Sequence, residues 1–189
     1  MKALLQTAAL LLAAALAPGA PAQEAAPRVA LETTLGTFVV ELWPAEAPKT
    51  VANFLGYVDR DFYDGLVFHR VIPDFMIQTG GYDADLEYRE PGAAIANESL
   101  GGPRNLRATL AMARMRDPDS AEAQFFVNLK DNRHLDAAGD RPGYTVFGEV
   151  IEGMDVVDRI SLVRTGVRDG MYDVPLEAVV IEEARRLTD

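Results

Sequence analysis

The residues best suited to chemistry lie in the stretch 68–78, FHRVIPDFMIQ, where an arginine interrupts an apolar run. Val, Ile and Phe give this stretch a high preference for β-structure. Strand alternation predicts that Arg70 shares its face with Phe68 and Ile72, whereas His69 lies on the opposite face. A guanidinium among apolar side chains is costly to desolvate unless something uses it. Arg70 is therefore either a structural ion pair with one of the many carboxylates or a functional group.

Two further stretches combine apolar residues with placed polar ones. Residues 110–115, LAMARM, are followed by a polar loop and then by residues 124–127, QFFV. Alternation places Gln124 and Phe126 on one face of the second segment. Residues 144–148, YTVFG, form the third stretch. Taken singly, the phenylalanines are more typical of a core than of a binding site, and only the constellation favours a functional interpretation.

The segments FHRVIPDFMIQ, LAMAR with AQFFV, and HLD with YTVFGEV stand in an order and at separations that resemble the cyclophilin family of peptidyl-prolyl cis-trans isomerases. The resemblance is strongest to the bacterial periplasmic cyclophilins and extends from about residue 29 to residue 181. It implies an enzyme that accelerates rotation about X-Pro bonds, with proline-containing polypeptides as substrates. It implies no cofactor and no metal.

Proline isomerisation needs no nucleophile, because its barrier is the loss of amide resonance, ~18–20 kcal/mol. An apolar pocket for the proline ring, a donor aimed at the prolyl nitrogen and anchors for the flanking backbone can favour the twisted amide. By resemblance, Arg70 is the catalytic donor. The other residues that the resemblance assigns to substrate binding are Phe75, Met76, Gln78, Ala113, Arg114, Gln124, Phe126, His134, Leu135 and Tyr144. His69, on the opposite face, is expected to be a core histidine.

The sequence departs from the best-known eukaryotic cyclophilins at three of these positions. His134 stands where they have tryptophan, Tyr144 where they have histidine, and Arg114 where they have asparagine. Arg114 is expected to add a positive charge beside the groove. Because the tryptophan packs against cyclosporin in strongly inhibited members, the smaller imidazole of His134 predicts weak binding of cyclosporin-type ligands beside substantial activity.

Composition excludes several other classes. The chain has 189 residues, a formal net charge of −11 and no cysteine, so a nucleic-acid surface, disulfides and cysteine chemistry are not expected. No serine lies in a nucleophile-elbow context. His69 and His134 lack the spacing of a metal site. The chain has the length of one ordinary domain.

The N-terminus has the pattern of an export signal. Lys2 precedes an apolar run from Ala3 to Ala17, and Ala20-Pro21-Ala22 has the small-x-small form of a signal-peptidase site. The run is shorter than the ~20 residues that span a membrane. We therefore predict a cleavable signal peptide at 1–22, a flexible lead-in at 23–27 and an isomerase domain at 28–189. The expected location is the periplasm or the medium, with no membrane association after cleavage.

The remaining pattern predicts the elements that position these residues. Alternation indicates a hairpin over 29–42 and a closing strand over 174–186, whereas apolar residues at helical spacing predict helices at 47–59 and 154–160. Two helices among many short strands suggest a mainly β fold, a closed and largely antiparallel barrel capped by the helices. The number of strands, eight, is implied by the resemblance alone.

Three functions remain open on the sequence. The leading one is an exported prolyl isomerase, acting as a monomer on folding proteins without a covalent intermediate. The second is a chaperone module that binds proline peptides in the same groove with little turnover. The third is an inert barrel in which Arg70 is an ion-paired strut. Rate measurement on an Ala-Pro peptide separates the first function from the other two.

Overall fold

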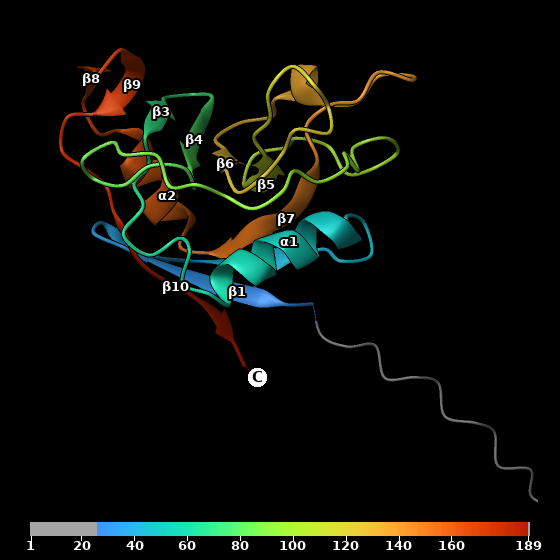
Figure 1. Cartoon of the computed structure of the whole chain (residues 1–189), viewed down its shortest axis with the longest axis horizontal. Coiled ribbons are helices and arrows are strands. Elements are labelled where there is room, and N and C mark those ends of the chain that lie inside the picture. The colour runs from blue at the N-terminus through green and yellow to red at the C-terminus, as the bar shows by residue number, and fades with distance from the viewer. Residues whose placement is uncertain (1–25, 189) are drawn as a thin grey trace, which may run out of the picture.

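The computed structural model describes residues 26–188 and shows a strongly curled sheet with helices packed against it (Figure 1). The predicted signal peptide and most of the predicted lead-in lie outside the described residues. Within 26–188, no helix is both long and apolar enough to cross a membrane.

Eight antiparallel strands form the main sheet, in the order β10-β1-β2-β7-β5-β6-β4-β3. The sheet strands are β1 (Arg28–Thr33), β2 (Gly36–Leu42), β3 (Arg70–Ile72), β4 (Met76–Thr79), β5 (Thr109–Met112), β6 (Phe125–Asn128), β7 (Val146–Glu152) and β10 (Ile181–Leu187). Strands β8 (Thr165–Arg168) and β9 (Met171–Pro175) form a separate hairpin beside β3 (Figure 1). The predicted eight-stranded antiparallel sheet is thus confirmed.

The prediction that this sheet closes into a barrel is wrong. The edge strands β3 and β10 form no ladder. The segment before β3 meets the β10 region through the bridge between Val67 and Val180 and through single backbone bonds, from Phe68 N to Val179 O at 3.0 Å and from Ile181 N to Leu66 O and Gly65 N to Ile181 O, both at 2.8 Å. Strand β3 is only three residues long, and Pro73, which follows it, has no N–H to extend a ladder. The sheet is therefore a curled half-barrel.

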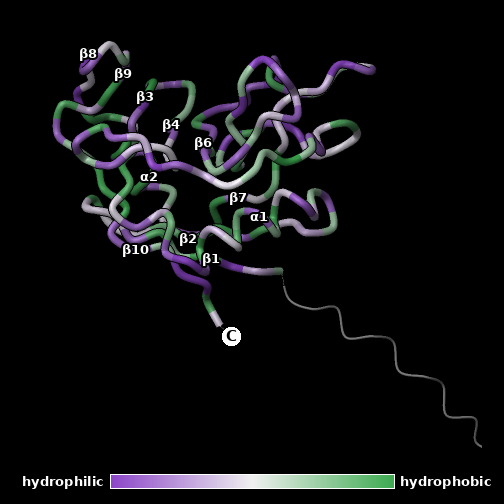
Figure 2. The backbone as a smooth tube through the Cα atoms, in the orientation of Figure 1, coloured by the Kyte–Doolittle hydropathy of each residue, from purple (hydrophilic) through white to green (hydrophobic). Residues whose placement is uncertain are grey.

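The closing strand is shorter than predicted. Residues 174–175 end β9, residues 176–180 lie outside any strand, and β10 begins only at Ile181. Figure 2 shows hydrophilic residues along much of β10. Charged side chains protect a free edge from pairing with another chain, which agrees with the place of β10 at the edge of the open sheet.

The two predicted helices are present as α1 (Pro48–Val58) and α2 (Met154–Ser161), and a short 3₁₀ helix, η1, spans Arg133–Leu135. In α1, proline suits the first turn, where its missing N–H costs no bond. The residue before the helix, Ala47, has no capping side chain. Glu98 supplies the cap instead, accepting bonds from Lys49 N at 3.1 Å and from Thr50 N at 2.9 Å.

The inner face of the sheet and the two helices enclose the main core. Its centre is a group of fully buried rings, with Phe54 of α1 lying 5.2–5.3 Å from the ring centroids of Tyr63, Phe125 and Phe147. We call this group and the apolar residues around it the inner cluster; it includes Val51, Leu55 and Val58 of α1 and Val156, Val157 and Ile160 of α2. These are the stripes that helical spacing predicts.

Candidate active site

A second apolar cluster covers the outer face of the same sheet. Its buried members are Met76, Ala111, Phe126 and Val146, one each from β4, β5, β6 and β7. We call this group, with the partly buried residues packed on it, the outer cluster; those residues are Trp43, Ile72, Phe75, Ala113, Leu135 and Tyr144. Strands β5 and β6 are consequently buried on both faces along their whole length.

A pocket of about 190 Å³ opens above the outer cluster. It is lined by nine of the eleven residues that the sequence assigns to a site: Arg70, Phe75, Met76, Gln78, Ala113, Arg114, Phe126, Leu135 and Tyr144. The other two residues contact this set. Gln124 accepts a hydrogen bond from Gln78, and His134 stacks on Phe75 with ring centroids 5.7 Å apart. The structure therefore brings all eleven together.

Arg70 lies at the solvent side of this pocket. Its side chain is 45% exposed, so the expected cost of burying a guanidinium does not arise. The reason is that β3 is an edge strand, paired only with β4, and its outer face is open. Phe68, predicted to share this face, instead precedes β3 and is fully buried in the inner cluster.

Arg70 also has the carboxylate partner that the sequence left open. Its Nε lies 3.8 Å from a carboxylate oxygen of Asp173 in β9, and the Asp173 side chain is 42% exposed. Exposed ion pairs of this kind contribute little to stability, typically below ~1 kcal/mol. The pair therefore orients the guanidinium without removing its availability to a ligand in the pocket.

The two glutamines form one unit, with Gln78 in β4 and Gln124 directly before β6. Gln78 Nε2 donates to Gln124 Oε1 at 2.9 Å. A side chain at Gly81 would collide with Gln124, since an added Cβ would lie 2.5 Å from its amide nitrogen. A side chain at position 81 would therefore require the Gln124 side chain to shift. Gln124 also hydrogen-bonds the side chain of His69, so the amide oxygen of Gln78 is the group that this pair leaves to accept from a peptide backbone.

Three buried asparagines beneath the pocket were missed in the sequence. Asn105, Asn128 and Asn132 have no solvent exposure. Asn132 Nδ2 donates to Phe75 O and to Asn128 Oδ1, both at 2.8 Å, and Asn132 N donates to Asn105 O at 2.7 Å. The network ties the backbone of Phe75 to the segment that carries η1. Asparagines at 128 and 132, so close to an apolar strand, were the available signal.

His69 points away from the pocket, as alternation predicts. It is 5% exposed, its ring lies 4.8 Å from that of Tyr82, and its Nδ1 has no hydrogen-bond partner. Burial lowers the pKa of His69 to about 4, and the neighbouring charge of Arg70 acts in the same direction. The histidine is therefore neutral at physiological pH and faces the interior.

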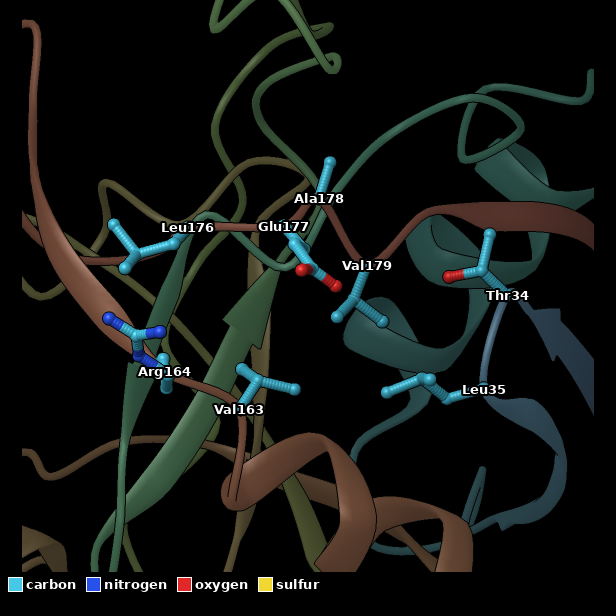
Figure 3. Close-up of a pocket in the computed structure, with 8 residues that line it drawn as sticks. All are labelled: Thr34, Leu35, Val163, Arg164, Leu176, Glu177, Ala178 and Val179. Carbon is cyan, nitrogen blue, oxygen red and sulfur yellow. The ribbon is translucent and has the colours of Figure 1, made fainter.

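An adjoining hollow of about 150 Å³ is lined by four of the predicted site residues, Gln78, Ala113, Arg114 and Gln124. A cavity of about 410 Å³ lies where the Thr34–Leu35 turn faces Val163 and Arg164, bordered by residues 176–179 (Figure 3). It is larger than the pocket beside Arg70 but includes none of the predicted site residues. Within 26–188, no three His, Cys, Asp or Glu side chains are grouped to hold a metal ion.

Comparison with known proteins agrees with the fold and the pocket. The family model described as "Cyclophilin type peptidyl-prolyl cis-trans isomerase/CLD" matches residues 28–186. The chain therefore belongs to the cyclophilin-type peptidyl-prolyl cis-trans isomerases and is an enzyme of that class.

Curated relatives are similar over most of their length. A peptidyl-prolyl cis-trans isomerase of Streptomyces antibioticus is 54% identical over 162 residues, which cover 84% of this chain and 98% of the relative. Peptidyl-prolyl cis-trans isomerase B of Escherichia coli is 48% identical over 158 residues, covering 82% and 96%. Peptidyl-prolyl cis-trans isomerase A of Dickeya dadantii is 43% identical over 157 residues, covering 83% of each chain.

Solved structures share the fold at low sequence identity. A cyclophilin-type isomerase of Cryptosporidium parvum matches with a TM-score of 0.73 at 21% identity, covering 87% of this chain and 99% of that one. The same protein in the presence of the dipeptide Ala-Pro matches with a TM-score of 0.72 at 22% identity, covering 86% and 99%.

Proposed function

We propose that this isomerase accelerates rotation about X-Pro bonds in exported proteins while they fold, through transition-state stabilisation without a covalent intermediate. The observation that carries the proposal is the convergence of Arg70, Gln78 and Gln124 on an apolar pocket large enough for a proline ring. The dipeptide used with the Cryptosporidium parvum structure, Ala-Pro, has the chemistry that such a pocket fits.

The chemistry follows from what rotation does to the amide. As the peptide bond twists, conjugation is lost and the prolyl nitrogen regains a lone pair that can accept a hydrogen bond. Arg70, charged at any relevant pH, supplies the donor for that lone pair. The interaction is stronger in the twisted state than in either planar isomer, which is the condition for catalysis by differential binding.

The pocket residues hold the two ends of the rotating bond. Phe75, Met76, Phe126 and Leu135 provide apolar surface for the proline ring. The Gln78–Gln124 pair lies beside Arg70's strand, where the free amide oxygen of Gln78 can accept from the flanking backbone. Holding the ring while the backbone turns confines the motion to the X-Pro bond. Ala113 offers the strand edge beside which the peptide lies.

The test is a conformer-trapping assay on an Ala-Pro peptide with residues 23–189, using Arg70→Ala beside an exposed control, Arg104→Ala. We expect Arg70→Ala to stay folded and to lose about 100- to 1000-fold in kcat/KM, the usual loss for one electrostatic donor. Arg104→Ala should match the wild type. Near wild-type turnover by folded Arg70→Ala would remove Arg70 from the mechanism, and peptide binding without turnover by the wild type would select the chaperone-module function.

We also propose export to the periplasm or the medium, supported by the charge, apolar run and small-x-small site of residues 1–22. The mature chain should begin at Gln23 and act as a monomer. Intact-mass analysis of protein recovered from the exported fraction tests the first point, and retention of residues 1–22 would overturn it. Light scattering of the mature protein tests the second.

A further inference from the structure

The side chain of Arg114 is held by three backbone carbonyls of its own chain. Its Nε donates to Gly143 O at 3.1 Å, and its two terminal nitrogens donate to Met115 O at 2.9 Å and to Pro142 O at 3.4 Å. A guanidinium has five N–H donors in a fixed planar fork. Three of these N–H donors are therefore bonded to the protein's own backbone. The positive charge that the sequence predicts beside the groove is thus held in place by its own chain.

The same guanidinium lies over the ring of Tyr144, with its central carbon 4.7 Å from the ring centroid. The Tyr144 ring also meets Phe126 edge to face at 5.7 Å and 74°. Tyr144 N also donates to Leu135 O at 2.9 Å. The tyrosine therefore contacts the arginine and two further residues that line the proline pocket, Phe126 and Leu135.

Other residues also hold the backbone of the segment that carries Tyr144, whereas Arg114 contacts the Tyr144 ring itself. Gly143 N donates to Ser99 Oγ at 2.8 Å, Gly143 O accepts a second bond from Asn97 Nδ2 at 3.1 Å, and Tyr144 O accepts one from Asn105 Nδ2 at 3.3 Å. Arg114 connects this segment directly to the strand edge that follows β5. It also borders both the proline pocket and an adjoining hollow of about 150 Å³. A change in its conformation would alter the wall between them.

We propose that Arg114 is a positioning residue that holds Tyr144 against Phe126 and so sets the width of the proline pocket, rather than a charge that attracts the peptide. The inference rests on the proposed function, because the pocket's width matters only if it receives a proline ring. It also links two of the chain's departures from the eukaryotic pattern, since the arginine and the tyrosine contact each other.

The decisive variant is Arg114→Lys, which keeps the charge but has neither the planar fork nor the stacking surface. We expect its kcat/KM on an Ala-Pro peptide to fall about five- to tenfold, mainly through KM, and to the same extent as in Arg114→Ala. The matched control is Arg116→Lys, two residues away on the exposed loop, which should match the wild type. Wild-type kinetics of Arg114→Lys beside a loss in Arg114→Ala would show that charge is what matters and would overturn the proposal.

A double-mutant cycle and a spectrum make the test independent of folding losses. In a Tyr144→Ala background, Arg114→Lys should cost less than twofold, because the ring that it positions is absent. An equal cost in both backgrounds would contradict the proposal. In the aromatic NMR spectrum, Arg114→Lys should shift the ring signals of Tyr144 and Phe126, and unchanged signals would also overturn it. This readout needs no turnover, so an inactive wild type would sink the proposed function while leaving the positioning role testable.

Discussion

The inner and outer clusters lie on opposite faces of the same strands, but only the outer cluster opens into a pocket. Consecutive residues of β6 show this, since Phe125 belongs to the inner cluster and Phe126 to the outer one. The inner rings are closed off by α1 and the curl of the sheet, and Phe54, Tyr63 and Phe125 are fully buried. The outer cluster is covered by partly buried residues such as Phe75, Leu135 and Tyr144 and opens into the pocket.

This difference indicates which face of the half-barrel can bind a ligand. A sheet face that is fully covered by the protein's own helices gains its stability on folding. A face covered only by a short 3₁₀ helix and a loop leaves apolar surface whose burial a ligand can complete. Arg70, at the free edge of the sheet beside this second face, is consequently placed where solvent and peptide can both reach it.

The largest effect expected is on Phe125→Ala, compared with Phe126→Ala. Removing the Phe125 ring from the packed inner cluster should cost about 3–5 kcal/mol of unfolding free energy, with kcat/KM nearly unchanged in the folded fraction. Phe126→Ala should cost less stability, about 1–3 kcal/mol, because water can enter its site from the pocket, but should lower kcat/KM more than tenfold. Urea unfolding and the peptide assay measure both. If the two variants lost the same unfolding free energy and the same fraction of kcat/KM, the distinction between the clusters would be wrong.

Cyclosporin binding tests the role of His134 at the rim of the outer cluster. His134 is exposed and stacks on Phe75, so tryptophan there would extend the apolar wall of the groove. The lost contact and hydrogen bond together amount to about 2–3 kcal/mol relative to tryptophan. His134→Trp should therefore tighten cyclosporin by about one to two orders of magnitude, with little change in turnover. Inhibition titration of both proteins measures this; low-nanomolar binding by the wild type would contradict the account of the rim.

The buried histidine next to Arg70 should make the stability of the protein depend on pH. The pKa of His69 is about 4 in the folded protein against an ordinary 6.5, so the unfolded chain binds more protons between these values. Stability should therefore be retained above pH 6.5 and be lost as the pH falls towards 4, by about 2 kcal/mol near pH 4.5. Urea unfolding of the wild type and of His69→Phe, each measured near pH 4.5 and above pH 6.5, isolates the contribution of the histidine, because the carboxylates titrate in both proteins. Parallel pH curves for the two proteins would refute it.

The smallest effect expected concerns Asp173, the partner of Arg70 across the groove edge. Because the pair is half-exposed and 3.8 Å long, Asp173→Asn should change stability by less than ~1 kcal/mol and kcat/KM by only about two- to fivefold. The effect on kcat/KM should shrink with added salt, which screens the pair in the wild type. A loss as large as that of Arg70→Ala would mean that Asp173 takes part in the reaction.

Local pattern alone determined the elements that have one buried face. Helical spacing placed the stripes of α1 and α2 close to their observed bounds, and alternation placed the first hairpin, whose turn the structure puts at Thr34 and Leu35. The positions 68–78, 110–115 and 124–127 provided the family, because their types and separations are specific. These features are short-range and are encoded in residues that are neighbours in the chain.

The tertiary structure decided what depends on residues far apart. Strands β5 and β6 are buried on both faces, so burial alone does not separate Phe125 from Phe126. Alternation puts the two rings on opposite faces, but only the fold decides which face opens into a pocket. Whether the sheet closes depended on a three-residue edge strand next to Pro73, and the exposure of Arg70 followed from that edge. Arg70 pairs with Asp173, and Arg114 contacts the carbonyls of Pro142 and Gly143 and the ring of Tyr144. These partners lie far along the chain, and only folding brings such groups within reach.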